Sequence, residues 1–371
     1  MKDTARPSLP AVASPVVIGP VVIGTVAAGA AWGAYTALRR YPPAGEKTWA
    51  RTNHRGEPLT LLEGPAVTVG AVTGQLIIAA VAAGRSGRPM APRDYPERVR
   101  PSAYPLVIAG LGGAAFGVID DLRGSTKRRG LRGHLGALAH GEVTTGTVKL
   151  AGLAVTGLGA AMLEGGNPAD VAINAGLIAG GANLLNLFDL RPGRAIKVAT
   201  GSAALIAAVG ALADGAAGRA SGAVAVAAPV GAALALLSED LGERAMLGDA
   251  GANALGAMLG AAAARALPRS ARLCLLTGIV ALTVASEKVS FTKVIEATPA
   301  LRWLDMLGRR PVPLAAPLSA SPLSASPLSA DPVSADPASP AAPADPAWTE
   351  RLARWIRGRR PGRHRRTKAA T

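Results

Sequence analysis

The sequence is dominated by long apolar blocks that contain almost no charged residues. A soluble chain would space its apolar side chains at intervals of 3.6 or 2 residues, whereas unbroken apolar runs are typical of helices that cross a membrane. We therefore predict an all-α, polytopic membrane helix bundle with about nine transmembrane helices. The predicted helices span residues 15–38, 62–84, 103–119, 148–163, 169–188, 196–214, 220–237, 251–266 and 271–286.

Composition and charge restrict the partners that such a chain can have. The formal net charge is +16, which in a soluble protein would suggest nucleic-acid binding. Here Lys and Arg gather between the apolar blocks and in the C-terminal tail, so loops beside an anionic membrane explain them better, and no nucleic-acid partner is predicted. The single cysteine, Cys274, excludes an internal disulfide framework and a Cys-based zinc site.

The distribution of basic residues predicts the orientation. The first apolar block ends in Arg39 and Arg40 without a clear cleavage site, so we interpret it as a retained helix. If nine helices alternate, four loops share one side, and the basic residues of the first two assign that side to the cytoplasm of the inner (plasma) membrane. The arginine-rich loop 85–102 falls on the other side and is an exception. The four loops are 39–61, 120–147, 189–197 and 238–250.

The C-terminal part of the chain differs from the rest. Residues 317–337 repeat a five-residue unit rich in Pro and Ser, which cannot form a packed core, so we predict a disordered C-terminal tether. Beyond it, four apolar residues share one helical face among arginines, which fits either a membrane-surface helix or a solvated basic tail. Those four are Trp348, Leu352, Trp355 and Ile356. The predicted divisions are an N-terminal tail (1–14), a transmembrane domain (15–310), a linker (311–346) and a basic amphipathic tail (347–371).

Two neighbouring carboxylates, Asp120 and Asp121, end one apolar helix. Adjacent carboxylates repel each other unless a cation lies near them, although a solvated helix end facing Arg123 is an alternative. The next loop is rich in groups that bind phosphate, or it is an ordinary basic cytoplasmic loop. Those groups are Lys127, Arg128, Arg129, Arg132, His134, Thr144, Thr145 and Lys149.

Two further polar clusters lie at predicted helix ends. Asn183, Asn186 and Asp189 follow one another at intervals of one helical turn, and amides in an apolar helix need partners, which packing between helices would also supply. Asp249 stands between Gly248 and Gly251 at the start of the next helix, where backbone N–H groups favour an anion. Three acidic clusters on one predicted side, beside a basic loop, indicate a site for Mg²⁺ and a pyrophosphate substrate.

In order and type, these motifs resemble the polyprenyl-phosphate N-acetylhexosamine-1-phosphate transferases, a superfamily that includes phospho-N-acetylmuramoyl-pentapeptide transferase. This chain looks like a divergent member, and the resemblance covers roughly residues 45–265. It rests on the Asp120-Asp121 pair, the Asn186/Asp189 segment, the run Gly248-Asp249-Ala250-Gly251, and Lys149 after a Thr-Gly turn.

The resemblance implies transfer of a sugar-1-phosphate from a UDP-sugar to a membrane polyprenyl phosphate, with release of UMP, in the synthesis of cell-envelope glycan or peptidoglycan precursors. It implies Mg²⁺, with Mn²⁺ as a substitute, and active-site loops that face the cytoplasm; a homodimer is left open. By carry-over, the catalytic residues are Asp120, Asp121 and Asp189, and the metal ligands are Asp249, Asp120 and Asp121. The residues assigned to substrate binding are Asn53, Lys127, Arg132, His134, Lys149, Asn183 and Asn186.

The chain departs from the family pattern in two places. Pro192 stands where these enzymes usually carry a further Asp, and residues 287–310 contain none of the histidines expected in the last cytoplasmic loop. These departures favour an alternative, a catalytically silent relative that binds polyprenyl phosphate or scaffolds cell-envelope enzymes. A transporter is a third hypothesis, although the charges lie at helix ends on one side and no inverted repeat is visible.

Overall fold

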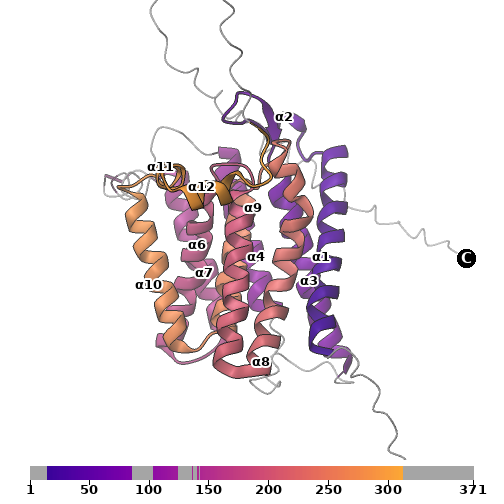
Figure 1. Ribbon diagram of the computed structural model, residues 1–371, viewed down its shortest axis with the longest axis vertical. Helices are drawn as coiled ribbons and strands as arrows, with labels where there is room; N and C mark the ends of the chain where they lie inside the picture. Colours follow the sequence, from indigo (N-terminus) through magenta and orange to yellow (C-terminus); the bar gives the residue numbers. More distant parts are fainter. Residues whose placement is uncertain (1–14, 86–102, 124–135, 137–139, 142, 312–371) are drawn as a thin grey trace, which may run out of the picture. The chain divides into compact units, whose positions relative to one another are not determined.

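The apolar runs form long helices that pack side by side in a computed structural model (Figure 1). The long helices are α1 (Pro15–Arg40), α3 (Glu63–Arg85), α4 (Ala103–Arg123), α6 (Thr145–Glu164), α7 (Pro168–Phe188), α8 (Arg194–Leu241), α9 (Gly248–Ala266) and α10 (Arg269–Ser286). Short helices are α2 (Glu46–Trp49), α11 (Phe291–Ala297) and α12 (Pro299–Met306). The strands β1 (Ala50–Thr52) and β2 (Pro58–Thr60) pair antiparallel in a hairpin.

The structure describes residues 15–85, 103–123, 136, 140–141 and 143–311. The chain divides into two units, Met1–Arg309 and Arg310–Thr371, and the helix bundle belongs to the first. Several predictions lie outside the described residues. They are the N-terminal tail 1–14, the loop residues 86–102, the linker and tail from residue 312, and Lys127, Arg128, Arg129, Arg132 and His134.

Seven segments of the described residues are long and apolar enough to cross a membrane, as in a multi-pass membrane protein. Two predicted crossings, 62–84 and 251–266, form helices α3 and α9 but are not among the seven, so the predicted number of nine is not confirmed. In α3 the side chains are described only for residues 63–80, which include Glu63 and Gln75. Helix α9 consists mainly of Ala and Gly, which lowers its hydropathy. The seven segments are Gly19–Arg40, Ala103–Arg123, Thr145–Glu164, Pro168–Phe188, Arg194–Ala213, Ser221–Leu241 and Arg269–Ser286.

Helix α8 turns back on itself and so accounts for two of these segments. Gly215 adopts a φ of 55°, a left-handed conformation that glycine reaches without steric cost. A Cβ added to Gly222 would lie 3.2 Å from the Cα of Ala207, whereas residues that far apart in a straight helix are separated by about 22 Å. The predicted pair of helices 196–214 and 220–237 is therefore this hairpin.

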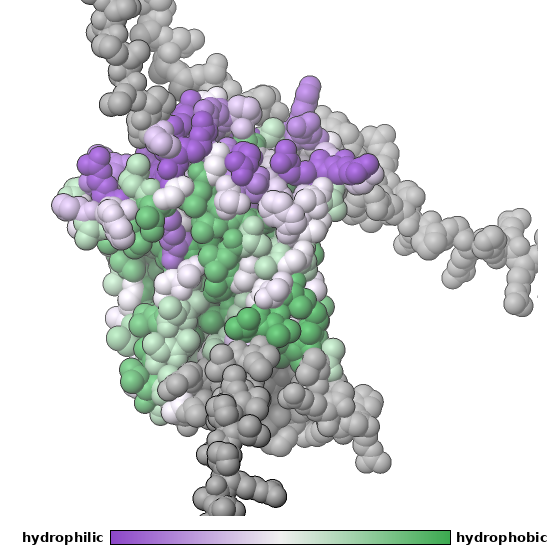
Figure 2. Space-filling view, turned by 45° about the vertical axis from the view of Figure 1, so that its right-hand side comes forward, coloured by the Kyte–Doolittle hydropathy of each residue, from purple (hydrophilic) through white to green (hydrophobic). Residues whose placement is uncertain are grey.

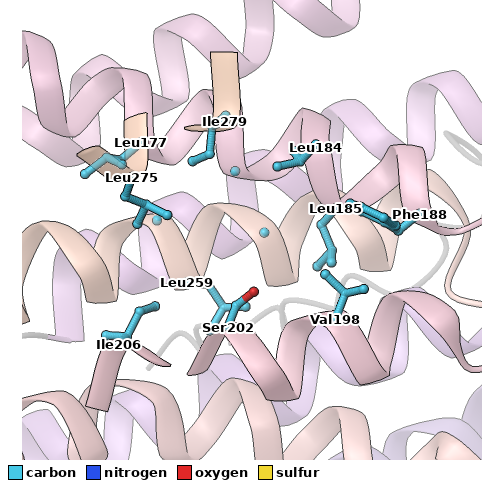
Figure 3. Close-up of a pocket in the computed structure, with 13 residues that line it drawn as sticks. Leu177, Leu184, Leu185, Phe188, Val198, Ser202, Ile206, Leu259, Leu275 and Ile279 are labelled. Atoms are coloured by element: carbon cyan, nitrogen blue, oxygen red, sulfur yellow. The ribbon is translucent and has the colours of Figure 1, made fainter. Parts of the chain in front are cut away.

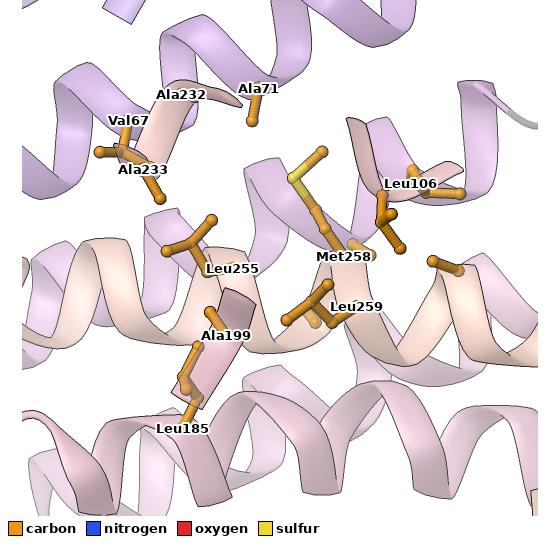
Figure 4. Packing of buried hydrophobic residues seen from close by; sticks show 14 of the residues in the cluster. Val67, Ala71, Leu106, Leu185, Ala199, Ala232, Ala233, Leu255, Met258 and Leu259 are labelled. Atoms are coloured by element: carbon orange, nitrogen blue, oxygen red, sulfur yellow. The ribbon is translucent and has the colours of Figure 1, made fainter. Parts of the chain in front are cut away.

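Helix α9 lies at the centre of the bundle, in contact with α3, α4, α6, α7 and α8. Nearly all of its residues are buried, and Leu255, Met258 and Leu259 pack among side chains of the surrounding helices (Figure 4). In lipid, close van der Waals packing rather than removal from water holds helices together. The small side chains of α9 permit that close packing, and they fix the position of its first residues.

Polar segments meet at one end of the bundle. Asn53 contacts Glu243 from the 238–250 loop, and Gly193 packs against Leu241. Lys149 contacts both Asp120 and Asp249. The four loops predicted to share one side therefore do meet, and Figure 2 shows hydrophilic side chains gathered at this end above an apolar flank. The assignment of this end to the cytoplasm stays a prediction.

Candidate functional site

The centre of the candidate site is a lysine shared by two carboxylates from different helices. Lys149 Nζ of α6 lies 2.8 Å from Oδ2 of Asp120 on α4 and 2.6 Å from Oδ2 of Asp249 on α9. All three side chains are largely buried, with 13%, 16% and 23% of Lys149, Asp120 and Asp249 exposed. The ammonium group relieves the repulsion that two close carboxylates would otherwise suffer.

Helices α4 and α9 approach so closely beside this cluster that only glycine fits between them. A Cβ added to Gly117, one turn before Asp120 and Asp121, would lie 2.6 Å from the Cα of Ala250. This contact brings the C-terminal end of α4 against the N-terminal end of α9. The sequence thereby places the Asp120-Asp121 pair directly beside Asp249.

Asp121 caps the first turn of α9. Its Oδ1 accepts a hydrogen bond from the backbone N–H of Asp249 at 3.0 Å, and its Oδ2 accepts one from Ala250 at 2.9 Å. Arg51 of β1 donates to the backbone carbonyl of Asp121. A negative charge is stabilising at a helix N-terminus. The sequence indicated that the N–H groups at the start of α9 favour an anion, and the anion that they meet is the carboxylate of Asp121.

A cavity of about 190 Å³ with an acidic lining lies beside the β1–β2 hairpin. Asp189, which is 7% exposed, and Asp240, which is 2% exposed, both line it. Each has one oxygen, Oδ2, that is buried and has no hydrogen-bond partner among the described residues. Burial, together with the negative charges of Asp240, Asp121 and Asp249, raises the pKa of Asp189 well above its usual range. A ligand with hydrogen-bonding groups would satisfy these oxygens, which accept when the carboxyl group is ionised and can donate when it is protonated.

Asn53, predicted to bind substrate, shapes the hairpin turn at the edge of this cavity. Its Oδ1 accepts from the backbone N–H groups of Arg55 at 2.9 Å and Glu57 at 2.8 Å. Its Nδ2 donates to Oε2 of Glu243 at 2.7 Å, and Arg55 Nε lies 3.0 Å from Oε1 of the same carboxylate. The neighbouring His54 also lines the cavity, and burial lowers its pKa, so the ring is neutral at neutral pH.

The two predicted amides of α7 are not joined to the Lys149 cluster. Asn183 and Asn186 are half-buried, and within the described part of the chain neither side chain forms a hydrogen bond. Asp189 follows them directly and lies in the acidic cavity instead. The structure therefore places Asp189 at the polar end of the bundle, and the roles of Asn183 and Asn186 in substrate binding stay predictions.

A separate apolar cavity of about 100 Å³ opens between α7, α8, α9 and α10 (Figure 3). Leu184, Leu185 and Phe188 line it from the last turns of α7, immediately before Asp189. Ser202 and Ile206 of α8 and Ile279 of α10 face them. The cavity thus runs along the helices from the polar end into the apolar part of the bundle.

The carboxylates at the site fit a metal ion that water and substrate also coordinate better than one held by protein groups alone. Among the described residues, no group of three or more His, Cys, Asp or Glu side chains is arranged to hold a metal ion by itself. Asp120 and Asp249 nevertheless direct one oxygen each at a single cation, the Lys149 ammonium. Mg²⁺ is usually held by one or two carboxylates together with water and substrate phosphates, so this pair fits Mg²⁺ and does not form an all-protein cage.

Sequence reasoning missed Asp240, Glu243 and Arg51. A signal existed for the first two, because Glu239, Asp240 and Glu243 directly follow an apolar run, as Asp120 and Asp121 do. Arg51 was counted only as part of the loop charge. Its contact with Asp121 depends on the hairpin fold, which a local pattern does not reveal.

No protein-family model matches the sequence, and no curated protein matches it either. The resemblance described from its motifs therefore stays a prediction. A function has to be inferred from the geometry of the site.

Proposed function

We propose that this protein transfers a sugar-1-phosphate from a UDP-sugar to a membrane polyprenyl phosphate and releases UMP. The observation that carries the proposal is the sharing of Lys149 by Asp120 and Asp249 at one end of an apolar helix bundle. Two carboxylates and a lysine that converge at one point suit a substrate with neighbouring phosphates. Their position at the helix ends suits an acceptor whose phosphate lies at the membrane edge.

The transfer makes and breaks one bond at phosphorus. An oxygen of the polyprenyl phosphate attacks the β-phosphorus of the UDP-sugar and forms a new P–O bond. The bond from that phosphorus to the bridging oxygen breaks, and UMP leaves with that oxygen. The products are UMP and a polyprenyl pyrophosphoryl sugar. Such a reaction depends on positioning and on neutralising charge rather than on a covalent enzyme intermediate.

The described residues have distinct roles in this proposal. Lys149 contacts phosphate oxygens and offsets the charge that develops on them. Asp121 positions Asp249 by holding the first turn of α9. Asp189, whose raised pKa favours its protonated form, donates a hydrogen bond to the donor substrate in the acidic cavity. The apolar cavity beside Leu184 and Phe188 receives part of the isoprenoid chain.

Mg²⁺ would be held by Asp120 and Asp249. When bound, it would neutralise charge on the phosphate oxygens of the substrates. Because two carboxylates supply only part of its coordination shell, we expect tight binding only in the presence of the UDP-sugar.

A catalytically silent relative that binds polyprenyl phosphate is the second candidate. Two observations favour it: Pro192 follows Asp189 where a further carboxylate is expected, and Lys149 occupies the space between Asp120 and Asp249. In that case the acidic end would recognise lipid phosphate through Lys149 without turnover.

Purified full-length protein in lipid nanodiscs separates the two candidates. It is incubated with polyprenyl phosphate, Mg²⁺ and a panel of UDP-sugars, and both UMP and lipid-linked sugar are quantified. The proposal predicts equal amounts of the two products with at least one donor, and none after addition of EDTA. Saturable binding of polyprenyl phosphate without either product, across the panel, would support the silent relative.

A further inference from the structure

Helix α12 turns its apolar side chains outward and its acidic side chain inward. Trp303 is 68% exposed and Leu307 52%, whereas Asp305 is 7% exposed. Trp303, Met306 and Leu307 follow at helical spacing on one face, and we call these three residues the α12 outer face. They line an open groove of about 650 Å³ together with Arg302. A helix on a water-facing surface would show the opposite arrangement.

The inward side of α12 is fixed by charged groups. Arg194, the first residue of α8, donates from Nε to Oδ1 of Asp305 at 2.7 Å and from Nη2 to Oδ2 at 3.1 Å. Lys197 donates to the backbone carbonyls of Leu304 at 3.1 Å and Asp305 at 2.7 Å. The buried, bidentate ion pair between Arg194 and Asp305 holds α12 in one orientation. Because these contacts hold the opposite side of α12 against α8, the α12 outer face points away from the bundle.

Helices α11 and α12 lie at the level where the membrane-crossing helices end. Helix α11 begins at Phe291, shortly after α10 ends at Ser286, and the Phe291 ring stacks on Phe188 at 5.0 Å. Phe188 is the last residue of α7. Both short helices run across the polar end of the bundle (Figure 1). Their level in the structure thus corresponds to a membrane–water boundary.

We propose that the α12 outer face lies in the headgroup layer of the anionic leaflet of the membrane that this chain itself crosses. An outward apolar face beside basic residues is the composition of helices that lie in this layer, and tryptophan is enriched there. Lys288, Lys293 and Arg302 are exposed around it and complement anionic lipid. Asp305 does not oppose this attraction because its charge is taken up by Arg194 and Arg309.

This contact would also hold the corner between α7 and α8. Arg194 and Lys197 belong to that corner, and Arg194 also donates to the hydroxyl of Thr292 in α11 at 3.0 Å. The corner carries Asp189, so lipid contact on one side of α12 and the ion pair on the other restrain the wall of the acidic cavity. Contact of the α12 outer face with lipid does not depend on the transfer reaction.

Site-directed spin labelling of the full chain tests the proposal. In a Cys274→Ala background, nitroxide labels are placed at Trp303→Cys and Leu307→Cys, with Lys47→Cys on exposed helix α2 as the water-facing control. The protein is placed in nanodiscs of phosphatidylglycerol and, separately, of phosphatidylcholine. Accessibility to oxygen and to a water-soluble nickel chelate is measured for each label.

We expect the labels at positions 303 and 307 to be several-fold more accessible to oxygen than to the chelate, and the label at position 47 to show the reverse. We also expect the difference to be larger in phosphatidylglycerol. Labels at 303 and 307 that match the control would overturn the proposal, because the face would then lie in water. Labels immobilised and shielded from both reagents would also overturn it, because a protein or a second copy would then cover the face.

Discussion

Lys149 Nζ lies 2.6 Å from Oδ2 of Asp249, although the two residues stand 100 positions apart in the chain. The contact joins α6 to the central helix α9, and Asp120 of α4 reaches the same ammonium. Three helices therefore meet at one cation. In a bundle whose other contacts are mostly apolar, this charged contact fixes how the polar ends of the helices sit together.

Replacing Lys149 with glutamine should destabilise the protein in a way that Mg²⁺ reverses. Without the ammonium, the carboxylates of Asp120 and Asp249 repel each other in a largely buried site, at a cost of about 1–3 kcal/mol. The midpoint of thermal unfolding in EDTA should fall. Mg²⁺ at saturating concentration should restore much of the loss, because it would take the place of the missing ammonium group and neutralise both carboxylates.

The Lys197→Gln variant is the control for this experiment. Lys197 donates to backbone carbonyls of α12 and does not contact Asp120 or Asp249. Its unfolding midpoint should fall without recovery in Mg²⁺. Equal recovery of both variants would mean that Mg²⁺ stabilises the protein elsewhere.

Replacing Asp121 with asparagine should loosen the start of α9. The amide retains one acceptor oxygen for two backbone N–H groups and loses the favourable charge at the helix N-terminus, a loss of about 1–2 kcal/mol. Hydrogen exchange followed by mass spectrometry should show faster exchange in the first turn of α9. The Asp120→Asn variant keeps the cap and should leave that exchange much less altered; an identical effect would contradict the capping role.

The Gly117→Ala substitution should separate α4 from α9 at the site. The new methyl group would lie 2.6 Å from the Cα of Ala250, so a backbone must shift, at about 1–3 kcal/mol. Turnover should fall together with stability. Gly159→Ala in α6 faces open space and should be neutral or slightly stabilising, by about 0.5 kcal/mol. Similar losses in both variants would contradict the claim that the close contact between α4 and α9 at Gly117 positions the site.

The sequence predicted the helices well because apolar runs of sufficient length have few other solutions. It also predicted that Asp120, Asp121, Lys149, Asp189 and Asp249 lie at one end, since alternating crossings put them there. The contact that each of these side chains makes was not predictable from the sequence. Whether Asp121 or a phosphate caps α9 depends on the backbone contact at Gly117, which brings together residues 133 positions apart (117 to 250).

The number of crossings shows a second limit of the sequence. Helix α9 is surrounded by other helices, and its small Ala and Gly side chains allow those helices to pack closely around it. Because α9 is shielded from lipid in this way, it does not need the high hydropathy of a lipid-facing helix. The sequence also did not reveal which side of α12 is buried. Asp305 is the buried residue and Trp303 the exposed one, and this inversion becomes visible only once Arg194 is seen to hold Asp305.

Removal of residues 312–371 should leave the chemistry intact. The polar groups assigned to the reaction and the lining of the apolar cavity all lie before residue 280, and the repeated Pro- and Ser-rich unit predicts a tether. The truncated protein should release UMP at a rate similar to that of the full chain in nanodiscs. Complete loss of turnover in a truncated protein that still folds would contradict the tether.

The most direct test of the proposed function compares UMP release by the wild type with that of Asp249→Asn, with polyprenyl phosphate, Mg²⁺ and the preferred UDP-sugar. Asp170→Asn is the matched control, because Asp170 lies in the first turn of α7 and pairs with Arg272 rather than with Lys149. We predict loss of turnover of at least about a hundredfold for Asp249→Asn, normal folding of that variant, and near wild-type turnover for Asp170→Asn. Full activity of Asp249→Asn would show that the Asp249 carboxylate is not needed for the transfer, and this would contradict the central claim that it takes part in the reaction.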